Sequence, residues 1–284
     1  MTTLKELQKL SCNYIDNLIF YLYQFLDKQY NHYRQKGFLH GLSGGVDSAT
    51  LLKLIVDRYG PESITCLITN LDDFSNPNDL NDAKELCDEL GVKYHFINIT
   101  KAVEALKKTF NGLNDCPKDN LASRIRIAIA CELSVKHNLR LLFAGPYSEW
   151  AIKGGDIIGG ATAHCYPFGG LYKSEVYAIA KKIGLPEKFI KKVTSNSSLE
   201  KENYKQVTNY GLKFSDVEKL LMFFNGLISE EKVAHIPNDK RVFFHYLLKV
   251  FEKDIDYPSL DRDEPERFGR KEFFAQFDKF PFET

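Results

Sequence analysis

Short apolar runs alternate with longer segments of helical periodicity through the first half of the chain, and this alternation most restricts its fold. The runs predicted to be strands are residues 38–41, 64–69, 93–99 and 140–144. The segments predicted to be helices are residues 4–34, 47–59, 79–90 and 120–136. Strands that alternate with helices form a parallel sheet covered on both faces. We therefore expect an α/β fold with a doubly wound parallel sheet, whose ligands bind at the carboxyl ends of the strands.

The second half of the chain has a weaker pattern. Residues 145–172 are rich in glycine and lack periodicity, which predicts a long functional loop. Helical patterns return at residues 173–183, 214–224 and 241–251. A length of 284 residues suits one large α/β domain with a terminal extension. We expect a domain over residues 1–257 and a charged, aromatic tail over residues 258–284, packed on the surface or on a second subunit.

Composition excludes several classes of protein. The 38 basic and 38 acidic residues give a net charge of zero, which argues against an electrostatic grip on nucleic acid or on a membrane surface. No apolar run reaches membrane-spanning length and no signal core follows the N-terminus, so we expect a cytoplasmic protein. None of the six cysteines forms a CxxC pair, which argues against a zinc ribbon or a CxxC redox site.

One string of residues follows the first predicted strand and opens a helix. It consists of Gly41, Leu42, Ser43, Gly44, Gly45, Val46, Asp47 and Ser48. Its glycines let the backbone approach an anion closely, and the helix N-terminus offers N–H groups and a positive dipole end. The Ser43 and Ser48 hydroxyls add donors, and Asp47 is placed to hold a divalent cation between phosphates. The string lacks the lysine of the Walker pattern and the spacing of GxGxxG.

This string resembles the pyrophosphate loop of the N-type ATP pyrophosphatases, which cleave ATP to AMP and pyrophosphate while adenylating a substrate. Residues 120–126 (NLASRIR), 145–150 (GPYSEW) and 167–176 (PFGGLYKSEV) narrow the resemblance to the ammonia-dependent NAD synthetases. The resemblance covers roughly residues 10–250 and is strongest from 38 to 190. It implies a doubly wound α/β domain, a homodimer, ATP as co-substrate and Mg²⁺ as cofactor.

The resemblance also implies roles for single residues at the ATP end of the site. The whole string from Gly41 to Ser48 would bind ATP, together with Lys173, whose ammonium would contact the phosphates. Asp47 and Glu149 would bind Mg²⁺. Asp47 and Lys173 are therefore the predicted catalytic residues.

The sequence departs from the family at the end of the site that binds the acid substrate. Ile157 replaces the lysine that family members direct at deamido-NAD, and His164 replaces an aspartate of the same stretch. The family's His-Lys pair reads Asp239-Lys240. An apolar side chain at 157 cannot make the charged contact of a lysine. We predict Arg124, His164 and Lys240 as substrate-binding residues.

The activity that the resemblance implies is that of an ATP-dependent, amide-forming ligase. It would adenylate the carboxylate of deamido-NAD and amidate it with ammonia, giving NAD, AMP and pyrophosphate. We expect a chain of this length to lack a nitrilase-type glutaminase domain, so free ammonium would be the nitrogen source unless a separate glutaminase supplies it.

Other functions remain open at this stage. A paralogue with the same adenylation chemistry would amidate a different carboxylate, such as nicotinate mononucleotide or a nucleotide- or sugar-linked acid. A sulfur-transferring tRNA enzyme would share the loop but would need paired cysteines and a basic surface, and neither is evident. Joint retention of Asp47, Glu149 and Lys173 argues against a non-catalytic nucleotide-binding module.

Overall fold

The protein is built around one parallel sheet. The computed structural model describes residues 12–32, 35–109, 118–152, 162–192, 211–253 and 266–267. The strands are β1 (Phe38–Gly41), β2 (Ile64–Asn70), β3 (Lys93–Asn98), β4 (Arg140–Leu142), β5 (Cys165–Tyr166) and β6 (Glu266–Arg267). Their order is β3-β2-β1-β4-β5-β6, and every neighbouring pair is parallel. The chain thus builds outward from β1 to one edge and then returns to build outward from β4, which confirms the doubly wound sheet.

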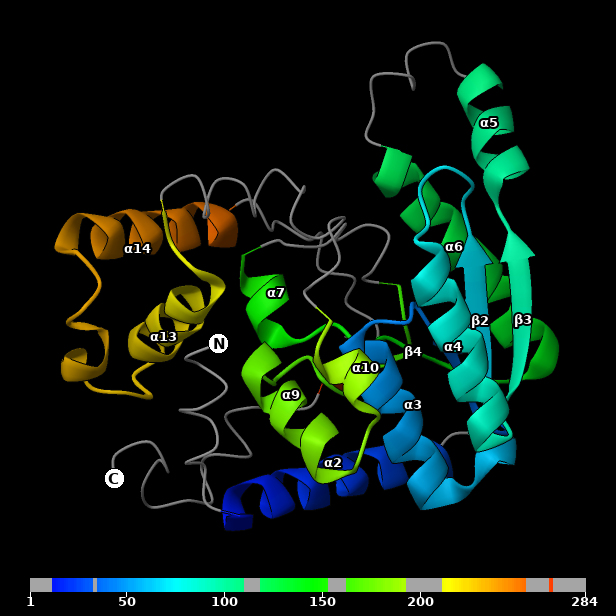
Figure 1. The fold of residues 1–284 in the computed structure, drawn as a ribbon, viewed down its shortest axis with the longest axis horizontal. Helices are drawn as coiled ribbons and strands as arrows, with labels where there is room; N and C mark the ends of the chain where they lie inside the picture. The colour runs from blue at the N-terminus through cyan, green and yellow to red at the C-terminus, as the bar shows by residue number, and fades with distance from the viewer. Residues whose placement is uncertain are drawn as a thin grey trace.

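Helices cover both faces of this sheet (Figure 1). The described helices are α2 (Cys12–His32), α3 (Val46–Tyr59), α4 (Pro77–Leu90), α5 (Thr100–Thr109), α6 (Lys118–His137), α7 (Tyr147–Ala151), α9 (Lys173–Lys182), α10 (Glu187–Ile190), α13 (Phe214–Phe224) and α14 (Asn238–Lys253). Short 3₁₀ turns, Pro61–Ser63 and Glu230–Val233, complete the described elements. Helices α3 and α4 pack on one face with α2 and α9 beside α3, while α6 packs on the other face and contacts α5.

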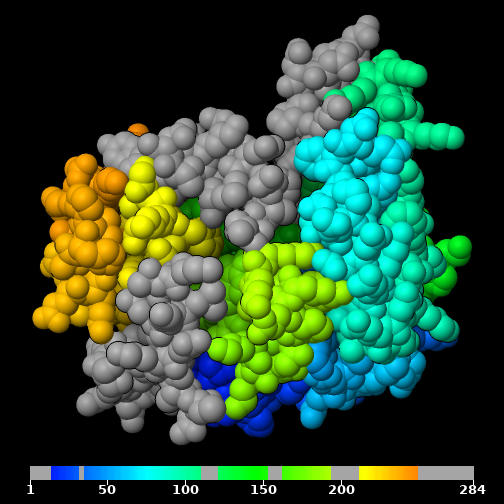
Figure 2. Space-filling model, in the orientation of Figure 1, coloured from blue at the N-terminus to red at the C-terminus, as the bar shows by residue number. Residues whose placement is uncertain are grey.

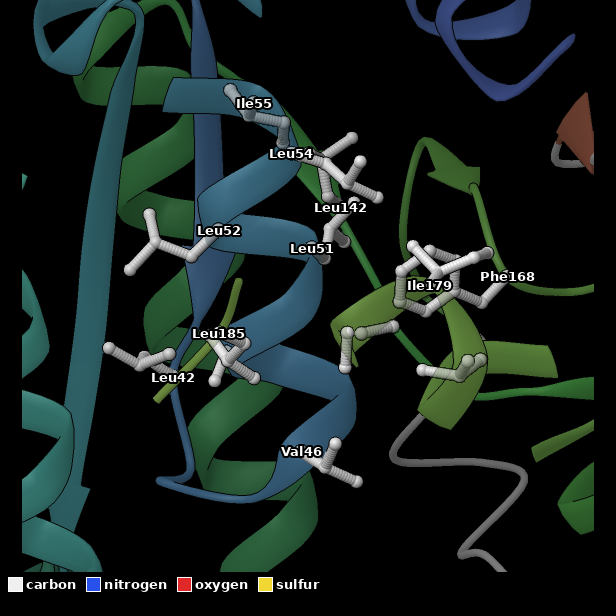
Figure 3. Close-up of a cluster of buried hydrophobic side chains, with 14 of the residues drawn as sticks. Leu42, Val46, Leu51, Leu52, Leu54, Ile55, Leu142, Phe168, Ile179 and Leu185 are labelled. Carbon is white, nitrogen blue, oxygen red and sulfur yellow. The ribbon is translucent and has the colours of Figure 1, made fainter. Parts of the chain in front are cut away.

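The main core lies between the sheet and helices α2, α3 and α9. Helix α3 is surrounded on most sides, so Leu51, Leu52, Leu54 and Ile55 are all completely buried. Figure 3 shows these side chains together with others from β4 and from the segment that includes α9. Burial of such aliphatic side chains stabilises the fold by about 1.5–3 kcal/mol each, and it holds α3 firmly against the strand that precedes it.

A second, smaller core joins α7, α13 and α14. Leu220 and Phe244 lie at its centre and are completely buried. In Figures 1 and 2 the helices α13 and α14, drawn in yellow and orange, lie on the opposite side of the molecule from α4 and α5. The packing of α7 into this core matters for the site, because α7 also contacts α9.

The helix ends follow local sequence signals. The Asn76 side chain accepts a hydrogen bond from the Asn78 N–H at 3.0 Å, and Pro77 occupies the first position of α4. Such a side-chain cap satisfies a backbone donor that has no acceptor inside the helix. Gly91 ends the same helix in the left-handed conformation with φ of +70°, which is the usual glycine termination.

Several elements were not predicted. Residues 145–172 are not a continuous loop, because α7 and β5 lie within them, and α5 is a further unpredicted helix. Helix α7 has five residues and β5 has two, which is too short for a periodic pattern. The tail adds β6 to the sheet through a parallel pairing with β5. Among the described residues, no helix is long and apolar enough to cross a membrane.

Candidate active site

The candidate site lies where the sheet reverses its strand order. β1 leads through residues 42–45 into α3, and β4 leads through residues 143–146 into α7. The two strands are parallel neighbours, with Phe38 opposite Arg140. Both connections therefore leave the sheet at the same edge, which is the position where ligands bind in doubly wound folds.

Serine hydroxyls hold the loop after β1. The Ser43 N–H donates to Oγ of Ser48 at 3.2 Å, and the two hydroxyl oxygens lie 3.1 Å apart. The Gly45 N–H donates to Oγ of Ser43 at 3.2 Å, while the Ser48 hydroxyl donates to the Gly45 carbonyl at 3.1 Å. The first intrahelical bond of α3 runs from the Ala49 N–H to Gly45. The first-turn N–H groups have no acceptor inside the helix, which makes this end suitable for an anion.

The other members of the predicted string contribute through the backbone. Gly41 is the last residue of β1, and the Leu42 N–H donates to the Leu67 carbonyl at 2.9 Å. The side chains of Leu42 and Val46 are buried in the main core (Figure 3). Gly44 has φ of +79°, and a Cβ at this position would lie 2.2 Å from the Asp79 carbonyl oxygen. The positive φ and the close approach of the Asp79 carbonyl both require glycine at this position. The loop therefore packs closely against the first turn of α4.

Three charged side chains from three helices meet beside this loop. Lys173, the first residue of α9, donates from Nζ to Asp47 of α3 and, at 2.8 Å, to Oε1 of Glu149 of α7. The lysine side chain is 6% exposed, against 27% for Glu149. One ammonium between two carboxylates leaves the cluster with a net negative charge, so it is suited to a further cation.

Electrostatics at this cluster are set by burial and by the neighbouring charges. Burial raises the pKa of Asp47 to about 6, an effect that Lys173 opposes and Glu149 reinforces. Burial disfavours the ammonium of Lys173, but Asp47 and Glu149 together hold its pKa above its ordinary value. The lysine is therefore protonated at neutral pH. The Asp47 Oδ1 atom is buried without a hydrogen-bond partner, and such an atom is costly unless something binds it.

Buried polar contacts place the two helices that carry Lys173 and Glu149. The Lys173 N–H donates to Oγ of Ser148 at 2.8 Å, so the first turn of α9 is tied directly to α7. Glu175 accepts from the Tyr172 N–H at 2.7 Å and from the Tyr14 hydroxyl at 2.5 Å. This carboxylate caps the start of α9, because acceptors there satisfy free N–H groups.

Glu218 supports the same region from α13. It is buried and accepts a hydrogen bond from the Ser174 N–H at 3.3 Å. Burial raises the pKa of Glu218, while hydrogen bonds from Ser148 and Ser174 oppose this effect. No role was predicted from the sequence for Glu175 or Glu218. Glutamate three residues after a helix cap is a known signal of a helix start, and this signal could have identified Glu175. No local signal marks Glu218.

The predicted substrate-binding residues lie on separate elements. Arg124 is exposed on α6, while Arg126, two residues later, donates to Oγ1 of Thr69 at 2.9 Å. Two arginines at this spacing thus face different surroundings. Lys240 lies on α14 and donates to the Gly211 carbonyl at 3.1 Å. Figure 1 shows α6 and α14 on opposite sides of the molecule.

His164 makes a backbone contact. Its Nδ1 accepts a hydrogen bond from the Leu141 N–H at 2.9 Å, beside β4. Burial and the nearby Arg140 lower the pKa of His164, which favours the neutral ring that this hydrogen bond needs. Ile157 lies outside the described residues, and Asp239 lies in the first turn of α14.

The donor set fits Mg²⁺ only in combination with a ligand. Among the described residues, no group of three or more His, Cys, Asp or Glu side chains is placed to hold a metal ion. Asp47 and Glu149 offer two carboxylates, and Mg²⁺ in nucleotide sites is commonly bound by one or two carboxylates plus phosphate oxygens. The partnerless Asp47 Oδ1 is consistent with this arrangement.

Comparison with known proteins identifies the family. Residues 18–253 match the family model described as NAD synthase. A curated relative from Campylobacter jejuni, "NH(3)-dependent NAD(+) synthetase", is 31% identical over 195 residues, which are 69% of this chain and 78% of the relative.

Solved structures share the fold. An NH3-dependent NAD synthetase from Campylobacter jejuni superposes with a TM-score of 0.68 at 23% identity, covering 83% of this chain and 93% of that one. An NMN synthetase from Francisella tularensis superposes with a TM-score of 0.63 at 25% identity, covering 82% and 92%. With the family match over most of its length, this chain belongs to the NAD synthase family.

Proposed function

We propose that this protein is an ammonia-dependent NAD synthetase, a ligase that uses ATP to convert the carboxylate of deamido-NAD into the amide of NAD. The observation that carries the proposal is the meeting of Asp47, Glu149 and Lys173 beside a phosphate-binding type of loop at the switch point of the sheet. Family membership and the 31% identical relative of that name support it.

ATP would lie with its phosphates against the loop and the start of α3. The Ser43 and Ser48 hydroxyls and the first-turn N–H groups would donate to phosphate oxygens. Asp47 and Glu149 would hold Mg²⁺, which supplies charge neutralisation of the triphosphate when bound. Because Lys173 stands between these carboxylates, its ammonium is also close enough to the loop to stabilise charge on the departing pyrophosphate.

The reaction would proceed in two steps. The substrate carboxylate attacks the α-phosphorus of ATP, forming an acyl-adenylate and releasing pyrophosphate. Ammonia then attacks the acyl carbon, forming the amide and releasing AMP and a proton. Neither step needs a covalent enzyme intermediate, so the residues of the site would act by positioning and by electrostatic stabilisation.

A second candidate is the amidation of nicotinate mononucleotide. The similarity to the NMN synthetase of Francisella tularensis, at 25% identity, favours it, as do Ile157, His164 and Asp239 at positions where the family binds deamido-NAD. The amidation of deamido-NAD keeps the stronger support, since the curated relative at 31% identity is an NH(3)-dependent NAD(+) synthetase.

The deciding experiment offers purified protein Mg-ATP and ammonium chloride with either deamido-NAD or nicotinate mononucleotide. Pyrophosphate release and the mass of the amide product are followed together, with Asp47→Asn as the inactive control. NAD formed in step with pyrophosphate supports the first proposal, and nicotinamide mononucleotide formed at the higher kcat/KM supports the second. Mg-ATP binding without either product would contradict both.

A homodimer in the cytoplasm, fed by free ammonium, completes the proposal. Light scattering coupled to size-exclusion chromatography tests the dimer, and replacing ammonium by glutamine in the assay tests the nitrogen source. Activity with glutamine alone would contradict the dependence on ammonia.

A further inference from the structure

Lys192, which follows α10, reaches the back of the loop after β1. Its ammonium donates to the Gly44 carbonyl at 2.9 Å and to Oδ1 of Asp79 at 2.6 Å. It also lies 2.6 Å from Oδ2 of Asp82. The lysine side chain is 22% exposed, so these contacts are partly shielded from water. One side chain therefore joins the loop, the start of α4 and the segment after α10.

The contact with Gly44 determines the direction of a peptide group. In a trans peptide the carbonyl and the following N–H point in opposite directions, and none of the described peptide bonds is cis. With the Gly44 carbonyl turned toward Lys192, the Gly45 N–H points the other way and donates to Oγ of Ser43 at 3.2 Å. That hydroxyl in turn contacts Ser48 at 3.1 Å. The placement of both serine hydroxyls therefore depends on the peptide that Lys192 holds.

The same ammonium offsets negative charge behind the loop. Asp79 and Asp82 are three residues apart and share a face of α4. Burial alone would raise the pKa of Asp82, but hydrogen bonds from Lys192 and from Lys188 hold it below its ordinary value. The carboxylates of Asp79 and Asp82 lie behind the loop. Their negative charges oppose the binding of a triphosphate anion to it, because like charges repel. A positive charge between them removes much of that opposition.

We infer that Lys192 is a positioning residue for ATP, holding the Gly44–Gly45 peptide and neutralising Asp79 and Asp82 so that the loop accepts the triphosphate. The inference rests on the proposed function. Lys192 acts on the carbonyl side of the loop and on α4, and it does not form part of the cluster of Asp47, Glu149 and Lys173. It therefore changes the affinity for ATP and not the rate of the chemical steps.

The test compares Lys192→Met with the matched control Lys188→Met. The Lys188 ammonium forms ion pairs with the same helix, α4, at 3.3 Å from Asp82 and 2.7 Å from Glu85. The Kd of Mg-ATP is measured by calorimetry without acid substrate, and kcat and KM are measured for ATP and for the acid. We expect Lys192→Met to raise both the Kd and the KM of ATP about tenfold, as for the loss of a charge-assisted contact. The kcat and the KM of the acid should stay within about twofold, and Lys188→Met should resemble the wild type.

Two further variants keep the test decisive. Lys192→Arg retains the charge and should recover most of the affinity, while Lys192→Gln retains a donor without the charge and should bind ATP with intermediate affinity. Equal Kd values for wild type, Lys192→Met and Lys192→Gln would overturn the positioning role and leave the proposed function intact. A fall in kcat at unchanged Kd would also overturn it. Failure of the wild type to bind Mg-ATP would overturn both proposals.

Discussion

The ammonium of Lys173 lies 2.8 Å from Oε1 of Glu149 and bonds Asp47 at the same time. It thus occupies the space between the two carboxylates that are proposed to hold Mg²⁺. Lysine and a divalent cation would therefore compete for the same two carboxylates until the phosphates of ATP offer the lysine another partner.

Replacing Lys173 by methionine should separate cation binding from catalysis. Without the ammonium, Asp47 and Glu149 bear uncompensated charge, so Mn²⁺ should bind the ATP-free variant at least about tenfold more tightly than the wild type. Turnover should fall by about 10²-fold or more, since a preorganised charge at the phosphates is lost. Electron paramagnetic resonance measures free Mn²⁺, and Lys53→Met, which removes an exposed pair with Asp57, is the control. Unchanged Mn²⁺ affinity would contradict the competition.

Asp47→Asn should abolish turnover while the fold persists. The substitution keeps the shape of the side chain but removes the negative charge that would bind Mg²⁺. We expect kcat to fall by about 10²-fold or more, with a thermal midpoint within a few degrees of the wild type. Pyrophosphate release and circular dichroism check the two parts. A variant that keeps full activity would exclude Asp47 as a metal ligand.

Gly44→Ala should damage both stability and ATP binding. A Cβ at this position would meet the Asp79 carbonyl oxygen at 2.2 Å, and φ is +79°. Gly184→Ala is the matched control, since its φ is +69° but nothing lies within 4 Å of its Cβ position. Backbone strain alone should cost the control about 1 kcal/mol, and Gly44→Ala should cost clearly more. Urea unfolding measures the loss of stability in both variants. Similar losses would show that the loop can shift to accommodate the added Cβ.

Stability should fall in mild acid because of His40. The ring lies in β1, 3.1 Å from the Ser48 carbonyl, and burial lowers its pKa from 6.5 to about 4. Between these values the unfolded chain binds a proton that the folded chain does not, so the free energy of unfolding decreases as the pH falls from about 6.5 to 4. The full effect is about 3 kcal/mol.

Comparison with His40→Gln isolates this contribution, because the other titrating groups are common to both proteins. Urea unfolding at several pH values should show the wild type losing its stability advantage over the variant on acidification. A difference between the two proteins that stays constant from pH 7 to 4.5 would contradict the assignment to His40.

Tyr14→Phe should loosen the start of α9. The tyrosine hydroxyl donates to Glu175, whose other oxygen accepts from the Tyr172 N–H. Removing the hydroxyl leaves a completely buried carboxylate with one partner fewer, at a cost of about 1–3 kcal/mol. Chemical denaturation measures this cost. A loss below about 0.5 kcal/mol, typical of a surface substitution, would show that the contact is replaceable.

Much of the secondary structure was predictable because long elements carry periodic signals. β1 at Phe38–Gly41 and α13 at Phe214–Phe224 have the predicted bounds, and α6 at Lys118–His137 differs from the prediction by two residues at its start and one at its end. The short elements α7 and β5 escaped prediction because their formation depends on neighbours. β5 exists through its pairing with β4 and β6, and a two-residue strand has no pattern of its own.

At the site, the sequence identified the residue types but not their arrangement. Asp47, Glu149 and Lys173 were each predicted, since the loop string and the family resemblance are local features of the chain. Ser148 beneath Lys173 and Glu218 from α13 were not predicted, because contacts across 25 and 44 residues are made by packing and leave no local pattern.

The sequence by itself therefore determined the α/β class, the glycine- and serine-rich loop after β1 and the three charged residues proposed for the site. These depend on apolar periodicity and on glycine and serine at fixed spacing, which act within a few residues. Tertiary structure alone decided that one buried ammonium lies between the two carboxylates and that Lys192 holds the loop from behind. Both contacts join segments that lie far apart in the chain, and burial and partner charges are properties of the assembled fold.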